Sequence, residues 1–295
     1  MVLNGFDIGS GYENYEAKKP FTFADHSSIG CGGYARAAFY PKTTEGLSAL
    51  IGKLEADKVP FYVVGNMTNV LPPDGESRRV FVCMNKLKDI RTKDGVYVSA
   101  GVTAGELLHK CKALSKTGAE FLEGIPCTLG GALYMNAGVK GAYIGDITES
   151  VTVLKKGRLR VIKRKDCTFS YKHSAFMDDE TVIVGANLRL ENADKEKIGK
   201  KLEEYRARRA HLPKGRSMGC VFKNPEGLFA GELIEGTGLK GFRVGGAKVS
   251  ETHGNFIIND RGATSAQVRT LIGIVKNAVF AQYKIRLEEE IRILE

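Results

Sequence analysis

The 295-residue sequence contains no tryptophan, only five histidines and no pair of cysteines at C-x-x-C spacing. Structural zinc sites and redox-active dithiols are built from closely spaced Cys and His residues, so this pattern argues against both. We expect no metal in the chemistry. The cysteines are scattered, as is typical of thiols in a reducing compartment: Cys31, Cys83, Cys111, Cys127, Cys167 and Cys220.

Long apolar runs are also missing. No segment approaches the roughly 18 apolar residues of a membrane helix, and residues 1–15 lack the apolar core of a secretory signal. We therefore expect a cytoplasmic protein with no membrane partner. A composition of 43% apolar and 26% charged residues is typical of a globular chain, and no internal repeat is present.

Acidic residues are fewer than basic ones, 34 against 44, which gives a net charge of +10. Such an excess attracts anions, although a merely basic surface accounts for it equally well. The absence of five consecutive basic residues argues against nucleic acid, and the basic stretch at 155–165 alternates like the outer face of a hairpin. We expect anionic small molecules as partners, no nucleic acid, and a monomer.

Apolar spacing predicts a helix at 43–57, one that carries Leu107 to Leu114 and ends at Gly118, and one that opens at Thr264 with a capping box to Gln267. The basic stretch 193–210, which begins where the strand pattern ends, is predicted to be a connecting helix. The stretch 124–145 is predicted to be poor in helix. Strands are predicted at 61–64, 79–84, 96–100, 150–154, 158–163, 181–190 and 285–294. This irregular order predicts an α+β fold.

Two segments look suited to binding phosphate: residues 64–71, which carry Gly65 among Asn and Thr residues, and the glycine-rich residues 124–138. Glycine lets the backbone approach a ligand, and successive N–H groups in such a loop can form a nest for an anion. Neither segment matches the P-loop or the dinucleotide-binding fingerprint. From the residues alone, each is either a tight turn or a phosphate site.

The same segments resemble those of a known family. Residues 64–71 resemble the pyrophosphate loop of the vanillyl-alcohol-oxidase (PCMH) type of flavin domain. Residues 124–138 are close to the "GIPGTxGGAxxMNAG" stretch of UDP-N-acetylenolpyruvoylglucosamine reductases (MurB), with Cys127 at a usual glycine position. Residues 26–35 resemble the "TxxxGGxA" entry of that family. The resemblance covers about residues 20–295 and fits the compact type without the tyrosine-bearing insertion.

The resemblance implies a PCMH-type FAD-binding domain at 20–193, followed by a smaller α+β substrate-binding domain at 194–295. It implies non-covalent FAD, NADPH as hydride donor, and reduction of UDP-N-acetyl-enolpyruvoyl-glucosamine to UDP-N-acetylmuramate for peptidoglycan synthesis. The implied FAD contacts are Gly65, Asn66, Met67, Thr68, Asn69, Val70, Pro126, Thr128, Gly130, Gly131, Asn136 and Gly138. The implied substrate contacts are Tyr171, Lys223, Asn224 and His253.

Reduction of an enolpyruvyl group leaves enolate character beside a carboxylate, so it requires charge stabilisation there and an acid for the adjacent carbon. The family's acid lies in "SxGSxFKNP", residues 217–225 here, where Cys220 replaces the serine. A thiol is mostly protonated at neutral pH and keeps the donor role. The resemblance therefore assigns protonation to Cys220.

The family's arginine in "FxYRxSxF" is Lys172 here, which keeps the charge but loses the planar fork that grips a carboxylate. Residues 288–290 are all glutamate, and strand alternation does not choose among them; the family pattern "LExEV" selects Glu290. Two alternative hypotheses stay open: another FAD-dependent oxidoreductase of this superfold, and a non-catalytic homologue that binds FAD or a UDP-sugar.

Overall fold

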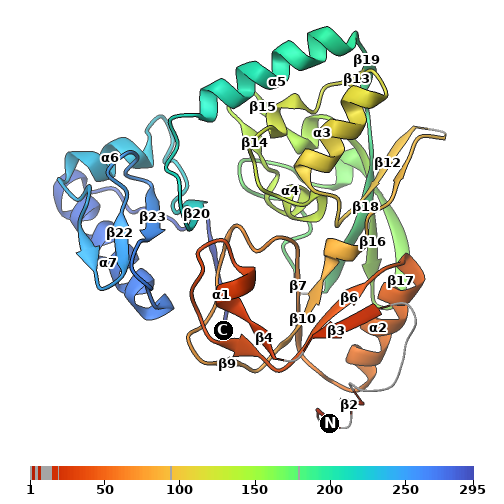
Figure 1. Cartoon of the computed structure of the whole chain (residues 1–295), viewed down its shortest axis with the longest axis horizontal. Helices are drawn as coiled ribbons and strands as arrows, with labels where there is room; N and C mark the ends of the chain where they lie inside the picture. Colours follow the sequence, from red (N-terminus) through yellow and green to blue (C-terminus); the bar gives the residue numbers. More distant parts are fainter. Residues whose placement is uncertain (1, 4–5, 8–14, 19, 94, 179) are drawn as a thin grey trace. The chain divides into compact units, whose positions relative to one another are not determined.

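The structure is a computed structural model that describes the chain except residues 1, 4–5, 8–14, 19, 94 and 179 (Figure 1). The chain forms two compact units, each built from stretches that are far apart in the sequence. The first unit comprises residues 1–19, 37–66 and 79–210. The second unit comprises residues 20–36, 67–78 and 211–295.

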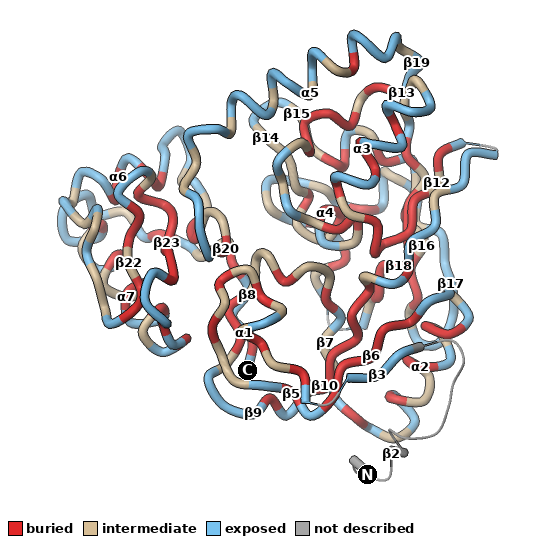
Figure 2. Tube along the Cα trace, viewed as in Figure 1, coloured by how far each residue is buried: buried red, intermediate tan, exposed pale blue. Residues whose placement is uncertain are grey.

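The first unit contains a small sheet in the order β3 (Tyr15–Lys18), β6 (Ala38–Pro41), β10 (Val80–Cys83), β7 (Phe61–Val64). The last three strands are parallel. Parallel neighbours need a crossover, and α2 (Thr44–Ala56) follows β6, burying Leu47, Leu50, Ile51 and Leu54. Strands β6 and β10 are buried along their length (Figure 2).

The second sheet of this unit is antiparallel, in the order β11 (Ile90–Arg91), β12 (Val96–Ser99), β18 (Thr181–Leu188), β16 (Thr148–Lys155), β17 (Arg158–Lys163). Helix α4 (Leu129–Met135) contacts β12 and β18, and α3 (Ala104–Ala113) contacts α5 (Lys195–Arg209). One apolar core joins residues from both sheets and these helices. The edge strand β17 is largely exposed (Figure 2).

Short elements complete the first unit. They are β1 (Val2–Leu3), β2 (Phe6–Asp7), η1 (Met84–Lys86), β13 (Lys116–Thr117), η2 (Glu120–Leu122), β14 (Gly138–Val139), β15 (Ala142–Tyr143), η3 (Ile144–Asp146), η4 (Arg164–Asp166) and β19 (Glu191–Asn192).

The second unit is built on an antiparallel sheet in the order β20 (Ser217–Cys220), β23 (Phe256–Asn259), β22 (Ala247–Val249), β21 (Arg243–Val244). Helix α7 (Ser265–Tyr283) contacts β21, β22 and α6 (Ala230–Gly236). The remaining elements are β4 (Phe21–Thr22), α1 (Phe23–His26), β5 (Tyr34–Ala35), β8 (Val70–Leu71), β9 (Glu76–Ser77) and β24 (Arg292–Ile293). Strand β8 pairs in parallel with β24, so the 67–78 segment is tied to the end of the chain.

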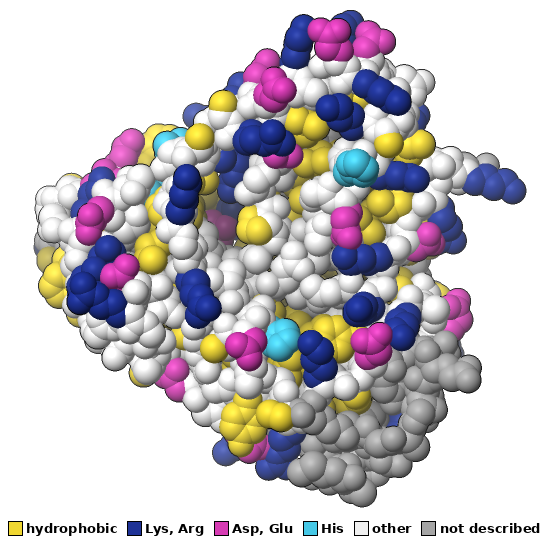
Figure 3. Space-filling model, in the orientation of Figure 1, with side chains coloured by type: hydrophobic (Ala, Val, Ile, Leu, Met, Phe, Trp, Pro, Cys, Tyr) yellow, Lys and Arg dark blue, Asp and Glu magenta, His cyan; other side chains and the backbone are white. Residues whose placement is uncertain are grey.

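Most predicted elements are confirmed. Helix α2 lies within the predicted 43–57, the predicted capping box of Thr264 and Gln267 opens α7, and residues 155–165 span the turn and outer strand of the β16–β17 hairpin. Lys and Arg side chains are spread over the face shown in Figure 3, among acidic ones. In the residues that the structure describes, we find no helix with both the length and the apolar character needed to cross a membrane.

Three predicted elements are wrong. Helix α3 ends at Ala113 rather than Gly118, because residues 116–117 pair with β19. The stretch 124–145 contains α4, which Thr128 caps by accepting a hydrogen bond from the Gly131 N–H. The predicted strand at 285–294 is a strand only at Arg292–Ile293, because its backbone pairs first with residues 221–223 and then with residues 69–71 rather than in one continuous ladder.

Candidate active site

In the first unit, the two glycine-rich segments meet at Gly65 and Thr128. A Cβ atom on Gly65 would lie 2.1 Å from Thr128 Oγ1, so no side chain fits there. The neighbouring Asn66 donates from Nδ2 to the Pro126 carbonyl at 3.2 Å and accepts from Asn85 Nδ2 at 2.8 Å. Asn85 carries no motif signal in the sequence, and its role emerges only from the fold.

The backbone after Gly65 offers hydrogen-bond donors. Among the described residues, none of the N–H groups of Asn66, Met67, Thr68 and Asn69 donates to another protein group. Met67 has a φ of +49°, in the left-handed region, which bends the chain within this run. Successive N–H groups of this kind form a concave site for oxyanions, so the segment fits a pyrophosphate group.

The second glycine segment works differently. The N–H groups of Leu129 and Gly130 donate to Val102 O (2.8 Å) and Ala100 O (2.9 Å), and Gly131 N–H donates to Thr128 Oγ1 (3.4 Å). The expectation of an anion-binding nest is therefore wrong for these three N–H groups. Gly130 instead allows close packing, since a Cβ there would lie 3.0 Å from the Cβ of Ala100.

Lys172 lies in a tight turn of the first unit. Ser170 and His173 exchange backbone hydrogen bonds of 3.1 and 3.2 Å across it, and Lys172 has a left-handed φ of +54°. Tyr171 is exposed, and Lys172 Nζ lies 6.0 Å from the centroid of its ring.

Beyond α4, Gly138 in β14 approaches the Ala142 carbonyl so closely that a Cβ would lie 2.2 Å from it.

The second unit brings Cys220 and Glu290 together although 70 positions separate them. Cys220 ends β20, and the next residue, Val221, accepts a hydrogen bond from the Glu290 N–H at 2.8 Å. Lys223 N–H donates to Glu288 O at 2.9 Å, and Phe222 forms a bridge with Glu289. The chain after Cys220 therefore runs hydrogen-bonded beside the three glutamates.

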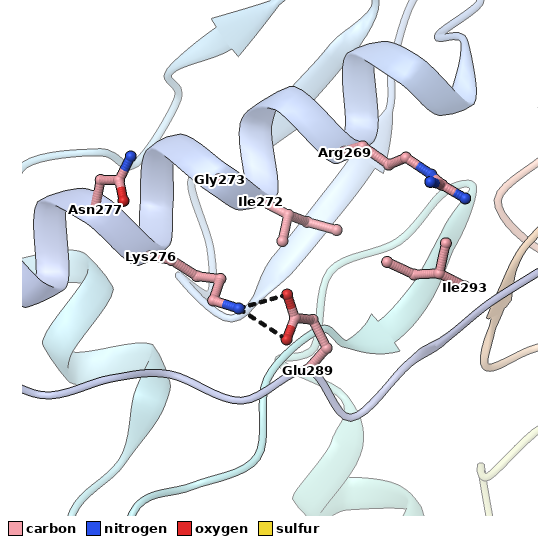
Figure 4. Close-up of a pocket in the computed structure, with 7 residues that line it drawn as sticks. All are labelled: Arg269, Ile272, Gly273, Lys276, Asn277, Glu289 and Ile293. Carbon is pink, nitrogen blue, oxygen red and sulfur yellow. Dashed lines mark hydrogen bonds and ion pairs between the residues drawn. The ribbon is translucent and has the colours of Figure 1, made fainter.

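The three glutamates differ in their surroundings. The Glu288 carboxylate is 3.3 Å from Lys223 Nζ, and the Glu289 carboxylate is 2.8 Å from Lys276 Nζ. Glu289 and Lys276 face a pocket of about 370 Å³, which Arg269, Ile272, Gly273, Asn277 and Ile293 complete (Figure 4). None of the predicted site residues lines this pocket, so we do not place the chemistry there.

The predicted flavin loop also fixes the backbone of Glu290. Asn69 Nδ2 donates to Glu290 O at 3.2 Å, and Arg292 N–H donates to Asn69 O at 2.9 Å. Both polar backbone groups of Glu290 are thus held, the N–H by Val221 and the carbonyl by Asn69. The position of Glu290 depends on a residue more than two hundred positions earlier in the sequence.

Two further residues, Ser28 and Asn255, hold the backbone around Cys220 and Glu290, and neither is among the site residues predicted from sequence. Ser28 donates from Oγ to Ser217 O (2.6 Å), and its N–H donates to Met67 O (3.2 Å). The buried Asn255 accepts from Phe222 N–H (2.9 Å) and donates to Phe222 O (2.8 Å). Local sequence does not reveal partners so distant along the chain.

His253 and Asn224, two predicted substrate contacts, both lie outside α6 and contact its first two residues, Ala230 and Gly231. Asn224 Oδ1 accepts from Ala230 N–H at 3.0 Å, and the His253 ring packs against Gly231. His253 Nδ1 accepts from Asn255 N–H at 3.1 Å, and burial lowers the pKa of the imidazole. Both features favour the neutral ring.

Comparisons with known proteins agree with this architecture. Residues 35–162 match the FAD binding domain family, and residues 211–294 match the C-terminal domain of UDP-N-acetylenolpyruvoylglucosamine reductase. The crystal structure of UDP-N-acetylenolpyruvylglucosamine reductase (MurB) from Thermus caldophilus is similar, with a TM-score of 0.83 and 31% identity, over 95% of this chain and 100% of that chain. These matches define an α+β flavin-binding protein of the PCMH type and confirm the predicted fold class.

Curated relatives identify the family. The chain is 36% identical over 273 residues to the UDP-N-acetylenolpyruvoylglucosamine reductase of Caldanaerobacter subterraneus subsp. tengcongensis, covering 91% of this chain and 90% of that protein. It is 38% identical over 275 residues to the enzyme of the same name from Geobacter metallireducens, covering 92% and 91%. The chain belongs to the UDP-N-acetylenolpyruvoylglucosamine reductase (MurB) family.

Proposed function

We propose that this protein is a UDP-N-acetylenolpyruvoylglucosamine reductase, which uses NADPH to convert UDP-N-acetyl-enolpyruvoyl-glucosamine to UDP-N-acetylmuramate in peptidoglycan precursor synthesis. Similarity to enzymes of this name over about nine tenths of the chain supports the proposal. The structural observation that carries it is the hydrogen bond from Glu290 N–H to Val221 O, which places Glu290 beside the chain that follows Cys220.

The residues of the first glycine segment fit FAD. In this proposal the N–H groups of Asn66 to Asn69 hold the pyrophosphate, together with Gly65 and Val70. The second segment contributes Pro126, Thr128, Gly130, Gly131 and Gly138. FAD, when bound, supplies the redox chemistry, since a flavin accepts hydride from NADPH and delivers it to an acceptor.

The side chains of this protein supply the acid and the charge. Hydride adds to one carbon of the enolpyruvyl double bond, and the Cys220 thiol gives its proton to the other, so that a saturated ether results. Lys172, as a cation, and Glu290, as a proton-donating group, stabilise the carboxylate and the enolate character that develops beside it. Tyr171, Lys223, Asn224 and His253 bind the substrate.

In this proposal residues 20–193 serve the flavin and residues 194–295 serve the substrate. The protein acts as a monomer in the cytoplasm, where nucleotide substrates and NADPH are available. Its net charge of +10 suits partners that are all anions.

The visible spectrum of the purified protein tests the proposal directly. We expect flavin bands that bleach anaerobically with NADPH and return when the enolpyruvyl UDP-sugar is added. Bleaching without recovery would mean that the second substrate is another compound. The absence of flavin bands, even after reconstitution with FAD, would refute flavin binding.

A further inference from the structure

Asn136 lies at the end of α4, and both the nitrogen and the oxygen of its side-chain amide form hydrogen bonds within the first unit. Nδ2 donates to Ser170 O at 2.9 Å, and Oδ1 accepts from Gly145 N–H at 3.0 Å. The residue is 5% exposed and adopts the left-handed conformation (φ 44°, ψ 56°) that ends the helix. A buried amide whose oxygen and nitrogen both bond to backbone holds those two backbone segments in a fixed relation.

The segment held by Nδ2 is the turn that carries Lys172. Ser170 O accepts two hydrogen bonds, one from His173 N–H across the turn and one from Asn136. Immediately after the turn, Ser174 Oγ donates to Tyr134 O at 2.7 Å. The turn is therefore tied to α4 at its start and just beyond its end.

The backbone conformation of Lys172 explains why the turn is held to α4 by hydrogen bonds. A non-glycine residue at φ +54° persists only where the surrounding structure imposes it, and such residues concentrate at functional sites. The bond from Asn136 fixes the carbonyl two residues before Lys172, and thereby the direction in which the turn presents its side chains.

Helix α4 links this turn to the flavin segment. Thr128 caps the start of α4 and touches Gly65, while Asn136 caps its end. With seven residues, α4 is a short connector between the contact at Gly65 and the turn that carries Lys172.

We propose that Asn136 is a positioning residue for Lys172: its carboxamide sets the position of the Lys172 turn relative to α4 and Gly65, and it does not itself contact the cofactor. This role replaces the flavin contact that the resemblance implied for Asn136. The inference rests on the proposed function, because Lys172 matters only in reduction of the enolpyruvyl group.

The experiment compares Asn136→Asp with Asn136→Ala in anaerobic stopped-flow measurements of the two half-reactions. Aspartate keeps the shape and the acceptor for Gly145 N–H but removes the donor to Ser170 O. We expect unchanged FAD content, a rate of flavin reduction by NADPH within about twofold of wild type, and reoxidation by the enolpyruvyl UDP-sugar slowed by about 10- to 100-fold. When Lys172→Met is already present, adding Asn136→Asp should slow reoxidation further by less than about twofold, because the residue that Asn136 positions has lost its charge.

Asn187→Ala is the matched control, because Asn187 Nδ2 donates to Ser150 Oγ at 3.1 Å within the sheet of the same unit. It should leave both half-reactions unchanged. If Asn136→Asp loses FAD, or slows both half-reactions equally, Asn136 contacts the flavin and the proposal is wrong. If Asn136→Asp leaves both half-reactions unchanged, as expected for Asn187→Ala, Asn136 does not position Lys172 and the proposal is also wrong. If wild-type protein is not reoxidised by the sugar, the proposed function fails instead. Should Asn136→Ala not fold, the near-isosteric Asn136→Asp decides.

Discussion

At the scale of single residues, Cys220 offers the sharpest test of the proposed chemistry. Removing the thiol with Cys220→Ala should slow flavin reoxidation by the sugar by about 10²- to 10⁴-fold, the usual contribution of a positioned acid, and leave reduction by NADPH intact. Cys220→Ser restores a proton donor and should recover most of the loss. Stopped-flow absorbance separates the two steps. Equal slowing of both would show that Cys220 supports the fold rather than the protonation.

Lys172 tests the charge at the carboxylate. Lys172→Met keeps the length but removes the charge, and should slow reoxidation by about 10²-fold. Lys172→Arg should keep the rate and lower KM for the sugar, because a guanidinium binds a carboxylate through two parallel hydrogen bonds. All three residues carry a Cβ, so the left-handed backbone is matched across the series. Activity unaffected by Lys172→Met would remove Lys172 from the mechanism.

At the scale of elements, Gly65 is required because β7 ends against the cap of α4 and leaves no room for a side chain. A Cβ would lie 2.1 Å from Thr128 Oγ1, so Gly65→Ala must displace the end of β7 or the cap of α4. We expect FAD affinity to fall by at least about tenfold, measured by fluorescence titration of the apoprotein. Gly105→Ala in α3, where nothing lies within 4 Å of the added Cβ, should leave affinity unchanged and stabilise the helix slightly. Equal affinities in both variants would refute the contact.

Elements with strong local signals could be predicted from sequence, and those decided by distant partners could not. The apolar face of α2 and the capping box of α7 are local, and both predictions are confirmed. Sequence does not predict helix α4, because Gly130 and Gly131 lower its helix propensity, whereas packing on Ala100 favours it. Apolar alternation predicts one strand at 285–294, but the backbone there pairs with residues 221–223 and then 69–71 rather than in one continuous ladder.

The same distinction holds for the site. Motif resemblance names Cys220 and Glu290, but only the fold shows that Val221 and Asn69 hold the backbone of Glu290. Ser28 and Asn255 act on backbone groups far along the chain, and nothing in their neighbours indicates this.

At the scale of the whole molecule, His253 links stability to pH. Burial, the largest cause, lowers its pKa below the ordinary value of 6.5, against an opposing effect of Glu235. The unfolded chain therefore binds a proton that the folded chain does not, and the free energy of unfolding should fall as pH drops through about 6.5. Urea unfolding between pH 8 and 5.5 should show a shallower fall for His253→Gln than for wild type. Identical pH dependence would contradict this origin.

The way each unit gathers distant stretches of chain determines how well its parts fold alone. The core of the second unit includes Ile29, Cys31 and Leu71, which lie outside residues 194–295. A fragment 194–295 would lose these side chains, each large aliphatic one worth about 1.5–3 kcal/mol on burial, and the pairing of β8 with β24. It would also expose Ile198 of α5, which is buried in the intact chain.

We therefore expect the fragment 194–295 to unfold at a clearly lower urea concentration than the full chain, with weak cooperativity, as monitored by far-UV circular dichroism. Losses of this size are a large part of the total stability of an ordinary domain. A longer fragment, in which linkers join residues 20–36 and 67–78 to residues 194–295, should regain a cooperative unfolding transition. A fragment as stable as the full chain would instead mean that residues 194–295 form an independent domain, and that Asn69 and Ser28 adjust the Glu290 and Cys220 segments without being needed to fold them.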